Sequence, residues 1–405
     1  MKRLVLPSLV LGLAACTAQL PTSETPPLAV PAGQDQAALA PGLGVGTSPV
    51  ASAAPAVASA PSPPPTALAA VEPPAPAPVA GPASCPDGMQ LVEGDYCTEV
   101  EHTCLEEWWD ESNKKRVCER FAPTSRCLGQ KVKKRYCIDT YEWPNKKGVR
   151  PEVMNAFYQA QVKCAAVGKR MCTESEWNFA CEGPDMLPFP YGYERDARKC
   201  NGDHKWDGPN MKKVGKRDPA ELARLWRGVP SGSQPQCVSP FGVADLPANA
   251  DEVVAAESPH AKFESVNTGG PWYKGVRNQC RPKIYTHDEG FYYYYLSFRC
   301  CSAPDGAAND PRTPGQIRKG DKWDMVERLA GFDVADARQK LDLKDKGQCT
   351  CKAGDVRCHT LCGTLLGPAA VDGTDATRVL GHAKETKHAP KGAAPKKPKG
   401  KKPKK

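Results

Sequence analysis

Cysteine is the residue type in this chain with the most reactive chemistry, and it occurs nineteen times in 405 residues. A thiolate can bind a soft metal or act as a nucleophile, whereas in an oxidising compartment two cysteines form a disulfide. The stretch GGPWYKGVRNQCRPKIY, from Gly269 to Tyr285, contains one cysteine, Cys280, and the preceding cysteine is Cys237. The first question is therefore whether Cys280 does redox chemistry or is half of a disulfide.

A second cluster, CTCKAGDVRCHTLC, has the residue types of a zinc site. Its candidate ligands are Cys349, Cys351, Cys358, His359 and Cys362. Their spacing, C-x-C-x6-C-x3-C, matches no zinc finger known to us, and two disulfides are the alternative that an exported chain favours.

The number of cysteines is even in each part of the chain once Cys16 is set aside. Fourteen lie between Cys85 and Cys301, and four lie between Cys349 and Cys362. Each group can therefore close on itself as disulfides, although the sequence does not give the pairing.

The first sixteen residues, MKRLVLPSLVLGLAAC, predict export. Lys2 and Arg3 precede an apolar run that is too short to cross a bilayer. The run ends in Leu-Ala-Ala-Cys16, which resembles the lipobox of bacterial lipoproteins, where the cysteine is lipidated. Thr17 then favours the outer membrane, facing the periplasm or the cell surface. The alternative is an ordinary secretory signal that contains a cysteine.

Low-complexity segments flank a folded block. Residues 17–83 are nearly all Ala, Pro, Val, Ser, Gly and Thr, which predicts a disordered linker. Within the tail, residues 366–405, ten lysines and one acid from Lys384 onward give +9, which is the net charge of the whole chain. A folded nucleic-acid-binding surface is therefore not indicated. The expected partners of residues 384–405 are anionic envelope polymers or lipid head groups, and the alternative is a solubilising tail.

Residues 84–303 carry most of the aromatic residues, and their Gly and Pro content predicts a loop-rich α+β domain with many disulfides. A helix is expected in RPEVMNAFYQAQVKCAAVGKR, with Pro151 near its start and Gly168 as its cap. The next, in TESEWNFAC, begins with a capping box of Thr173 and Glu176, and Trp177 is expected in the core.

Three further segments complete the sequence-based description. Residues 98–135 form an insertion in which Trp108 and Trp109 either make a recognition surface or pack the insertion onto the domain. The run FYYYY, Phe291 to Tyr295, is expected to be an aromatic strand, with one face in the core and the other either exposed or a platform for a carbohydrate or peptide. In the cysteine-containing region 304–365, KWDMVERLAGFD predicts a helix with Trp323, Val326, Leu329 and Ala330 at helical spacing.

Eight motifs occur in an order that resembles one known family. They are YCIDTYEWPN, GKRMCTESEWNFACEG, FPYG, CN, SPFGVADLPANADEVV, GGPW, CR and LSFRCC, between Tyr136 and Cys301. Together they resemble the formylglycine-generating enzyme, or sulfatase-modifying factor, domain. The resemblance implies a C-type-lectin-related fold that is poor in regular secondary structure and often stabilised by calcium.

The enzymes of this family hold copper between two thiolates five positions apart and use oxygen to convert a sulfatase cysteine to formylglycine. By resemblance, Cys280 stands at the second of these positions and Gly275 at the first. Copper(I) needs both soft sulfur ligands, so copper is not expected here and Cys280 is expected in a disulfide. The alternative is a divergent oxidase in which Cys237, Cys300 or Cys301 folds next to Cys280.

The family's calcium motif is partly retained in DLPANADEVV. Asp245, Asn249 and Glu252 match, whereas Asp251 and Val253 replace two tryptophans. The resemblance implies a structural calcium held by Asn249 and Glu252, with Asp251 as an additional ligand. An acidic surface loop is the alternative.

The function expected from the sequence is a lipid-anchored, disulfide-rich protein that binds a partner, a protein or a glycan, at the cell envelope. One rival is the divergent oxidase, and another is an inert domain that carries a functional lysine tail. Motifs of serine hydrolases, nucleotide-binding loops and zinc proteases are absent from the sequence.

Overall fold

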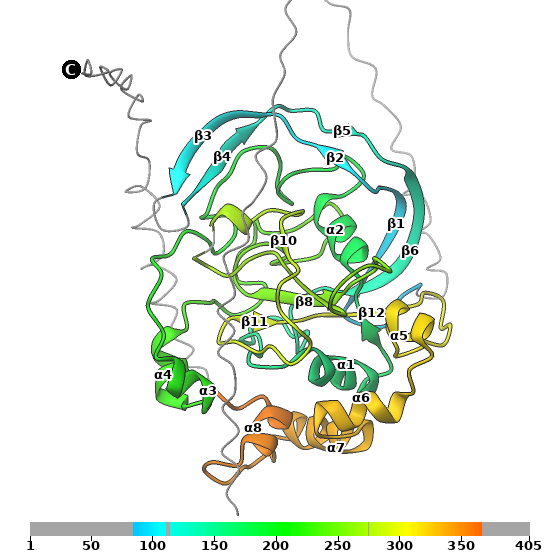
Figure 1. Cartoon of the computed structure of the whole chain (residues 1–405), viewed down its shortest axis with the longest axis vertical. Helices are drawn as coiled ribbons and strands as arrows, with labels where there is room; N and C mark the ends of the chain where they lie inside the picture. The colour runs from blue at the N-terminus through cyan, green and yellow to red at the C-terminus, as the bar shows by residue number, and fades with distance from the viewer. Residues whose placement is uncertain (1–83, 111–113, 274, 367–405) are drawn as a thin grey trace, which may run out of the picture. The chain divides into compact units, whose positions relative to one another are not determined.

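A computed structural model describes residues 84–110, 114–273 and 275–366 (Figure 1). Cys16, the linker 17–83 and the lysine-rich tail from residue 367 onward lie outside the described residues. The described chain mixes helices with open sheets, as the sequence predicted for its fold class. No helix in these three ranges is long and apolar enough to cross a membrane.

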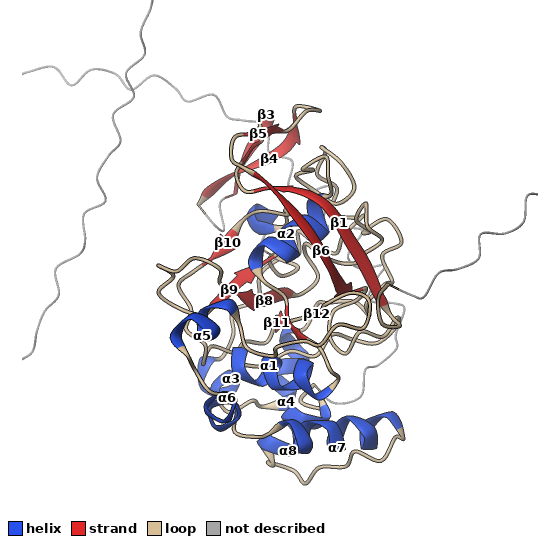
Figure 2. Cartoon of the chain, turned by 90° about the vertical axis from the view of Figure 1, so that its right-hand side faces the viewer, coloured by secondary structure: helices blue, strands red, loops and turns tan. Residues whose placement is uncertain are grey.

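Two four-stranded sheets form the centre. The first has the order β1 (Met89–Cys97), β6 (Lys131–Asp139), β12 (Cys300–Ser302) and β7 (Arg170–Met171). The second has the order β10 (Lys283–Ile284), β9 (Ser265–Thr268), β8 (Asp251–Ala255) and β11 (Leu296–Ser297). β1 and β6 pair over nine residues and form a long antiparallel ribbon (Figure 2).

The insertion caps one end of this ribbon. It contains β2 (Val100–Glu101) paired with β5 (Arg126–Cys127), and β3 (Cys104–Asp110) paired with β4 (Lys115–Phe121). Trp108 is half-buried and donates its indole N–H to Glu119 at 3.1 Å, whereas Trp109 is 47% exposed. The Trp108 ring also lies 5.8 Å from the guanidinium of Arg195, outside the insertion, so Trp108 packs the insertion onto the domain, whereas Trp109 faces solvent.

The helix α1 (Phe157–Ala166) begins six residues after Pro151, later than predicted. The reason is Met154, whose positive φ of 68° interrupts a right-handed helix and whose N–H donates to the carbonyl of Tyr293. Gly168 follows the helix with φ of 74°, as a glycine cap requires.

The helix α2 (Glu174–Glu182) starts as predicted. The Thr173 side chain accepts from the Glu176 N–H, and the Glu176 carboxylate accepts from the Thr173 N–H at 2.8 Å. Trp177 is fully buried in the core.

The helices after residue 313 pack against α1. They are α5 (Pro314–Lys319), α6 (Trp323–Ala330), α7 (Val334–Asp345) and α8 (Val356–Cys362). Val162 and Ala166 of α1 share a core cluster with residues of this region. The predicted helix at Trp323 is confirmed, and Val326 and Ala330 of its predicted apolar face are buried, whereas Leu329 is 53% exposed. Two more short helices, α3 (Met211–Gly215) and α4 (Pro219–Leu225), lie on the same side of the domain (Figure 1).

Nine disulfides join all eighteen cysteines of the described residues, and both groups close on themselves as predicted. The pairs are 85–137, 97–127, 104–118, 164–300, 172–301, 181–280, 200–237, 349–362 and 351–358. In the last two pairs, the Sγ atoms of Cys351 and Cys362 are 3.4 Å apart, so the two disulfides lie side by side. The four cysteines that were candidate zinc ligands are therefore bonded to one another.

The predicted strand at Phe291–Tyr295 is wrong. Only Leu296 and Ser297 after it pair, in β11. The rings of Tyr293, Tyr294 and Tyr295 pack against one another, with centroids 4.6 to 5.0 Å apart, so they do not alternate between two faces.

Candidate functional site

Cys280 is bonded to Cys181 at the end of α2. The S–S distance is 2.04 Å, the Cα atoms are 5.4 Å apart, and both residues are fully buried. The three cysteines that could have joined Cys280 in an oxidase are bonded elsewhere: Cys237 to Cys200, Cys300 to Cys164, and Cys301 to Cys172. In this arrangement Cys280 has no thiolate to offer to a metal or a substrate.

Gly275 lies in a buried 3-10 turn (Gly275–Arg277), and the space beside it is filled. A Cβ atom at this position would lie 2.5 Å from Nη2 of Arg195 and 2.5 Å from Oδ1 of Asp203. Arg195 and Asp203 form an ion pair that is almost completely buried. A second cysteine would therefore need this ion pair to move, and the residues present do not fit a two-thiolate copper site.

Arg281, the residue after Cys280, forms a second link between this segment and α2. Arg281 donates from Nε and Nη2 to the two carboxylate oxygens of Glu182, at 2.6 Å each, and from Nη2 to the carbonyl of Cys97 at 2.7 Å. A paired fork of this kind is among the strongest hydrogen-bonding arrangements in proteins. The disulfide and the ion pair together hold Cys280 and Arg281 to α2.

The expected calcium ligand Glu252 is committed to Arg299. Both carboxylate oxygens accept from Arg299, at 2.6 and 2.7 Å, and one also accepts from the Trp177 indole at 3.0 Å. The other N–H groups of Arg299 donate to the carbonyls of Asp139, Thr140 and Ala244. Burial of Arg299 opposes its charge, but Glu252 outweighs it and raises the pKa of the guanidinium.

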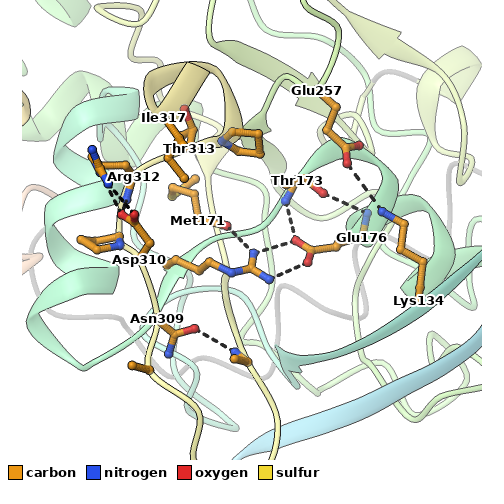
Figure 3. A pocket seen from close by; sticks show the side chains of 15 residues that line it. Lys134, Met171, Thr173, Glu176, Glu257, Asn309, Asp310, Arg312, Thr313 and Ile317 are labelled. Atoms are coloured by element: carbon orange, nitrogen blue, oxygen red, sulfur yellow. Dashed lines mark hydrogen bonds and ion pairs between the residues drawn. The ribbon is translucent and has the colours of Figure 1, made fainter. Parts of the chain in front are cut away.

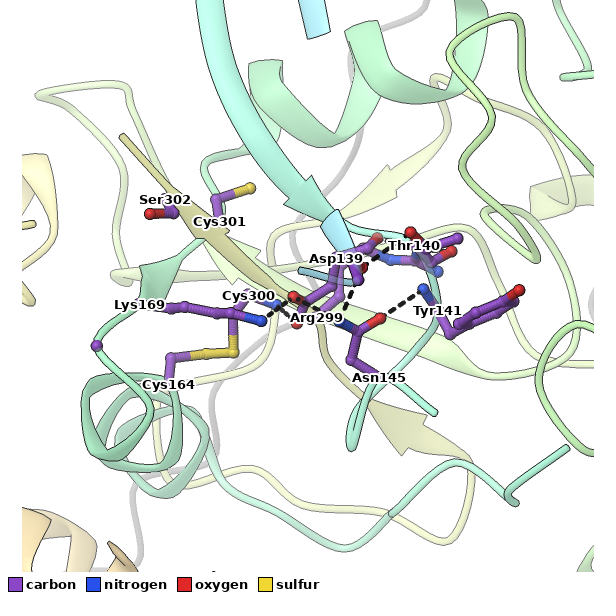
Figure 4. A network of polar contacts seen from close by, with 12 residues as sticks. Asp139, Thr140, Tyr141, Asn145, Cys164, Lys169, Arg299, Cys300, Cys301 and Ser302 are labelled. Carbon is purple, nitrogen blue, oxygen red and sulfur yellow. Dashed lines mark hydrogen bonds and ion pairs between the residues drawn. A yellow bond between two sulfur atoms is a disulfide. The ribbon is translucent and has the colours of Figure 1, made fainter. Parts of the chain in front are cut away.

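Figure 4 shows where this network meets β6. The buried Asp139 carboxylate accepts from Lys169 at 2.6 Å, from the Asn145 amide at 3.0 Å and from the N–H of Cys300 at 3.0 Å. Its acceptors are thus committed to the fold as well. Burial still raises the pKa of Asp139, against the effect of Lys169.

Asn249 and Asp251 are also engaged within the protein. The Asn249 amide donates to Glu142 at 2.8 Å and to the carbonyl of Val229 at 3.2 Å, and its oxygen accepts from the N–H of Val229 at 2.8 Å. Asp251 is paired with Arg277. All three predicted ligands are buried, so the surface-loop alternative is wrong. The oxygens face protein donors, and an arginine occupies the position facing Glu252, so these residues do not fit a calcium ion as they stand.

Two buried acids next to this network, Asp245 and Glu142, have raised pKa values. Asp245 is 1% exposed; one of its carboxylate oxygens accepts from the N–H of Gly232 at 2.6 Å, and the other has no partner among the described residues. Burial raises the pKa of Asp245 to about 6. Burial, followed by the charges of Asp245 and Glu252, raises the pKa of Glu142 well above its usual value. The motif alignment singled out Asp245, but nothing in the sequence marked Glu142.

Two surface pockets meet beside α2 and form a polar groove. One encloses about 430 Å³ and the other about 280 Å³, and Lys134 of β6 and Glu257 line both. Figure 3 shows the smaller pocket, with Glu176 close to Thr173. The Glu176 carboxylate accepts from the Arg170 guanidinium at 2.6 and 2.8 Å. We call the two together the α2 groove. Besides the shared pair, its ionic residues are Arg170, Glu174, Glu176, Lys283, Asp310 and Arg312.

Cations and carboxylates are paired along the α2 groove. Glu174 accepts from Lys283 at 3.2 Å and from the Tyr285 hydroxyl at 3.0 Å. Burial raises the pKa of Glu174, but Lys283 outweighs it and the net shift is downward. Lys134 donates to the Ser175 hydroxyl at 2.5 Å, and this hydroxyl donates to Glu257 at 2.8 Å. No cysteine or histidine is among the described residues that line the groove, which offers hydrogen-bond donors, acceptors and charges.

Comparison with known proteins gives only distant similarities. No protein-family model matches the chain, and no curated protein matches it. Similar solved structures include CarF, with 12% identity, a TM-score of 0.35 and coverage of 54% of this chain and 99% of CarF. PvdO from Pseudomonas aeruginosa has 15% identity, a TM-score of 0.35, and coverage of 55% and 100%. Treponema denticola variable protein 1 has 14% identity, a TM-score of 0.31, and coverage of 53% and 99%. Similarity at this level carries no argument about function.

Proposed function

We propose that this chain is an exported, lipid-anchored binding protein of the cell envelope. Its folded domain is related to the formylglycine-generating enzyme but lacks that enzyme's copper chemistry. Cys16 is the lipidated residue, residues 17–83 are the tether, and the lysine-rich tail adds contacts with anionic polymers or lipids. The ligand of the domain is a protein or a glycan.

The observation that carries this proposal is the bond between Cys181 and Cys280. A copper oxidase of this family needs a free thiolate at Cys280 and a second one at position 275. In this chain the sulfur of Cys280 is bonded to Cys181, and the space beside Gly275 is occupied by Arg195 and Asp203. Without these thiolates the two-thiolate copper chemistry has no site, and we infer that the domain binds a partner instead.

The α2 groove is the surface that best suits a polar ligand. Its carboxylates and cations offer both acceptors and donors, and Lys134 and Glu257 stand where its two halves join. Exposed aromatic area is also present, since Tyr285 is 52% exposed at the rim.

The test is a thiol count on the mature protein, purified from an oxidising compartment and denatured without a reductant. We expect no free thiol and no stoichiometric copper(I) binding. Two free thiols that include Cys280, together with one bound copper(I), would refute the proposal in favour of the divergent oxidase.

Anchoring is tested separately with Cys16→Ala. The substitution should move the protein from the membrane fraction to the soluble fraction. Deletion of residues 384–405 in the wild-type background then measures the part of envelope association that depends on the lysines, which should fall as salt rises.

A further inference from the structure

A third cavity lies between α1, the end of α3 and the C-terminal helices α6 and α8. It encloses about 530 Å³, which is within the range of small-molecule sites. Figure 1 shows the end of α3 next to α8 in this region. The cavity is lined by Gln159, Gly215, Lys216, Arg217, Tyr292, Ala330, Gly331, Phe332, Val356, Arg357 and Thr360. Three of these side chains are cationic, and none of the described lining residues is an acid.

Arg217 is the unusual member of this set, because it is buried without a carboxylate. It is 9% exposed, and its guanidinium donates to the Thr360 hydroxyl at 2.5 Å. It also stacks on the Tyr292 ring, with 4.3 Å to the centroid. No ion pair joins it to any acid of the described residues, and burial lowers its pKa. A buried cation without a counter-ion is costly, and a bound anion would remove that cost.

The neighbouring charges add to the positive potential. Lys163 is buried behind Thr360, to whose carbonyl it donates at 2.7 Å. Lys163 shares a single carboxylate, Glu152, with Lys344, so two cations there face one anion.

At the mouth of the cavity, Arg357 is paired with Asp336. Lys216 is exposed and has no ion pair with any described residue. Lys216 and Arg217 are therefore adjacent cations without acidic partners. The cavity thus has surplus positive charge at its wall and its mouth.

We propose that this cavity binds the phosphate group of a phosphate ester. A guanidinium binds phosphate through two parallel hydrogen bonds, and an ammonium adds a point charge. A phosphate dianion matches two unpaired cations, whereas a carboxylate neutralises only one of them. Tyr292, Phe332 and Val356 give the apolar part of the ester a surface to pack on. We call this cavity the phosphate pocket.

The experiment is titration calorimetry of the mature, disulfide-bonded chain at constant ionic strength. The probes are inorganic phosphate, phenyl phosphate and acetate. We expect one site, with phenyl phosphate binding more tightly than inorganic phosphate because its ring adds apolar contact, and acetate binding at least tenfold more weakly. Equal affinities for acetate and inorganic phosphate would overturn the assignment to phosphate.

Two variants locate the site. R217Q should weaken phenyl phosphate binding by about tenfold or more, since a charge-assisted hydrogen bond is lost. K216Q changes an exposed side chain that cannot disturb the core, and it should weaken binding severalfold. The matched control is K212Q, an exposed lysine of α3 outside the cavity, which should bind like the wild type. Unchanged binding by K216Q and R217Q, or no binding by the wild type, would overturn the proposal.

A further measurement distinguishes the two sources of such a phosphate group, a lipid head group and a soluble ester. In a chain that carries C16A and lacks residues 384–405, so that neither the anchor nor the lysine tail holds it to vesicles, binding to vesicles of phosphatidylglycerol that is lost in K216Q but kept in K212Q would identify a lipid head group. If the chain binds phenyl phosphate, and K216Q does not change its binding to vesicles, the phosphate belongs to a soluble ester.

Discussion

Removal of the Cys181–Cys280 disulfide tests both the pairing and the way in which the disulfides act together. A disulfide stabilises a protein mainly by restricting its unfolded chain, and the effect grows with the loop that it closes. These cysteines are 99 residues apart in sequence, which alone would give about 4.7 kcal/mol. In the unfolded chain, however, the Cys172–Cys301 disulfide already brings the two segments together. The shortest remaining path is nine residues to Cys172 and twenty-one from Cys301, a loop of about 30 residues worth about 3.6 kcal/mol.

The matched control is removal of Cys172–Cys301 itself. Its sequence separation of 129 residues is larger, so separation alone predicts the greater loss. The adjacent Cys164–Cys300 disulfide leaves a loop of about nine residues, worth only about 2.6 kcal/mol. All four cysteines are fully buried, so the cavities left by alanine are similar in both variants.

We therefore expect C181A/C280A to lose about 1 kcal/mol more than C172A/C301A. The assay is guanidinium unfolding without a reductant, followed by tryptophan fluorescence. Equal losses, or a greater loss in C172A/C301A, would refute the reasoning. A loss under about 1 kcal/mol in C181A/C280A would show that the Cys181–Cys280 bond does not form in the folded protein.

Two further predictions concern buried charges. R299M removes the partner of Glu252 and should cost about 3–5 kcal/mol. The control R198M breaks only the solvent-exposed pair with Asp196 and should change stability far less, so similar losses in chemical denaturation would contradict this prediction. Because burial raises the pKa of Asp245 from 3.8 to about 6, the folded chain retains a proton that the unfolded chain releases in this interval, so stability should fall as the pH rises from about 4 to about 6. D245N should reduce that fall, measured as the denaturation midpoint against pH, and a variant with the full wild-type slope would show that another group is responsible.

Features fixed by neighbouring residues were predictable from the sequence. The start of α2 depends on Thr173 and Glu176, which are three positions apart, and its capping box forms as expected. The start of α1 was misplaced because Met154 takes a left-handed conformation and bonds to Tyr293, a contact with a distant segment. The even number of cysteines indicated disulfides, but Cys181 could not be named as the partner of Cys280, since only the fold brings them together.

The polar sites were also hard to predict, because their residues are far apart in the sequence. Glu252 was found by its motif, yet its role depends on Arg299, which lies far along the chain and arrives through the pairing of β12. The α2 groove and the phosphate pocket were missed entirely. Their charged residues come from separate segments, and no spacing in the sequence connects Lys134 with Glu257 or Arg217 with Thr360.

The neighbouring cysteines of β12 give the central sheet a fixed alignment. Successive side chains of a strand point to opposite faces, and Cys300 and Cys301 accordingly belong to different core clusters. Their partners, Cys164 and Cys172, lie one on each side of the sheet. If β12 slipped by one residue against β6 and β7, both sulfur atoms would turn away from their partners. The two disulfides thus fix the register of β12 covalently. An isomer with exchanged partners could form only if β12 turned over, and with it the buried Arg299 that directly precedes the strand.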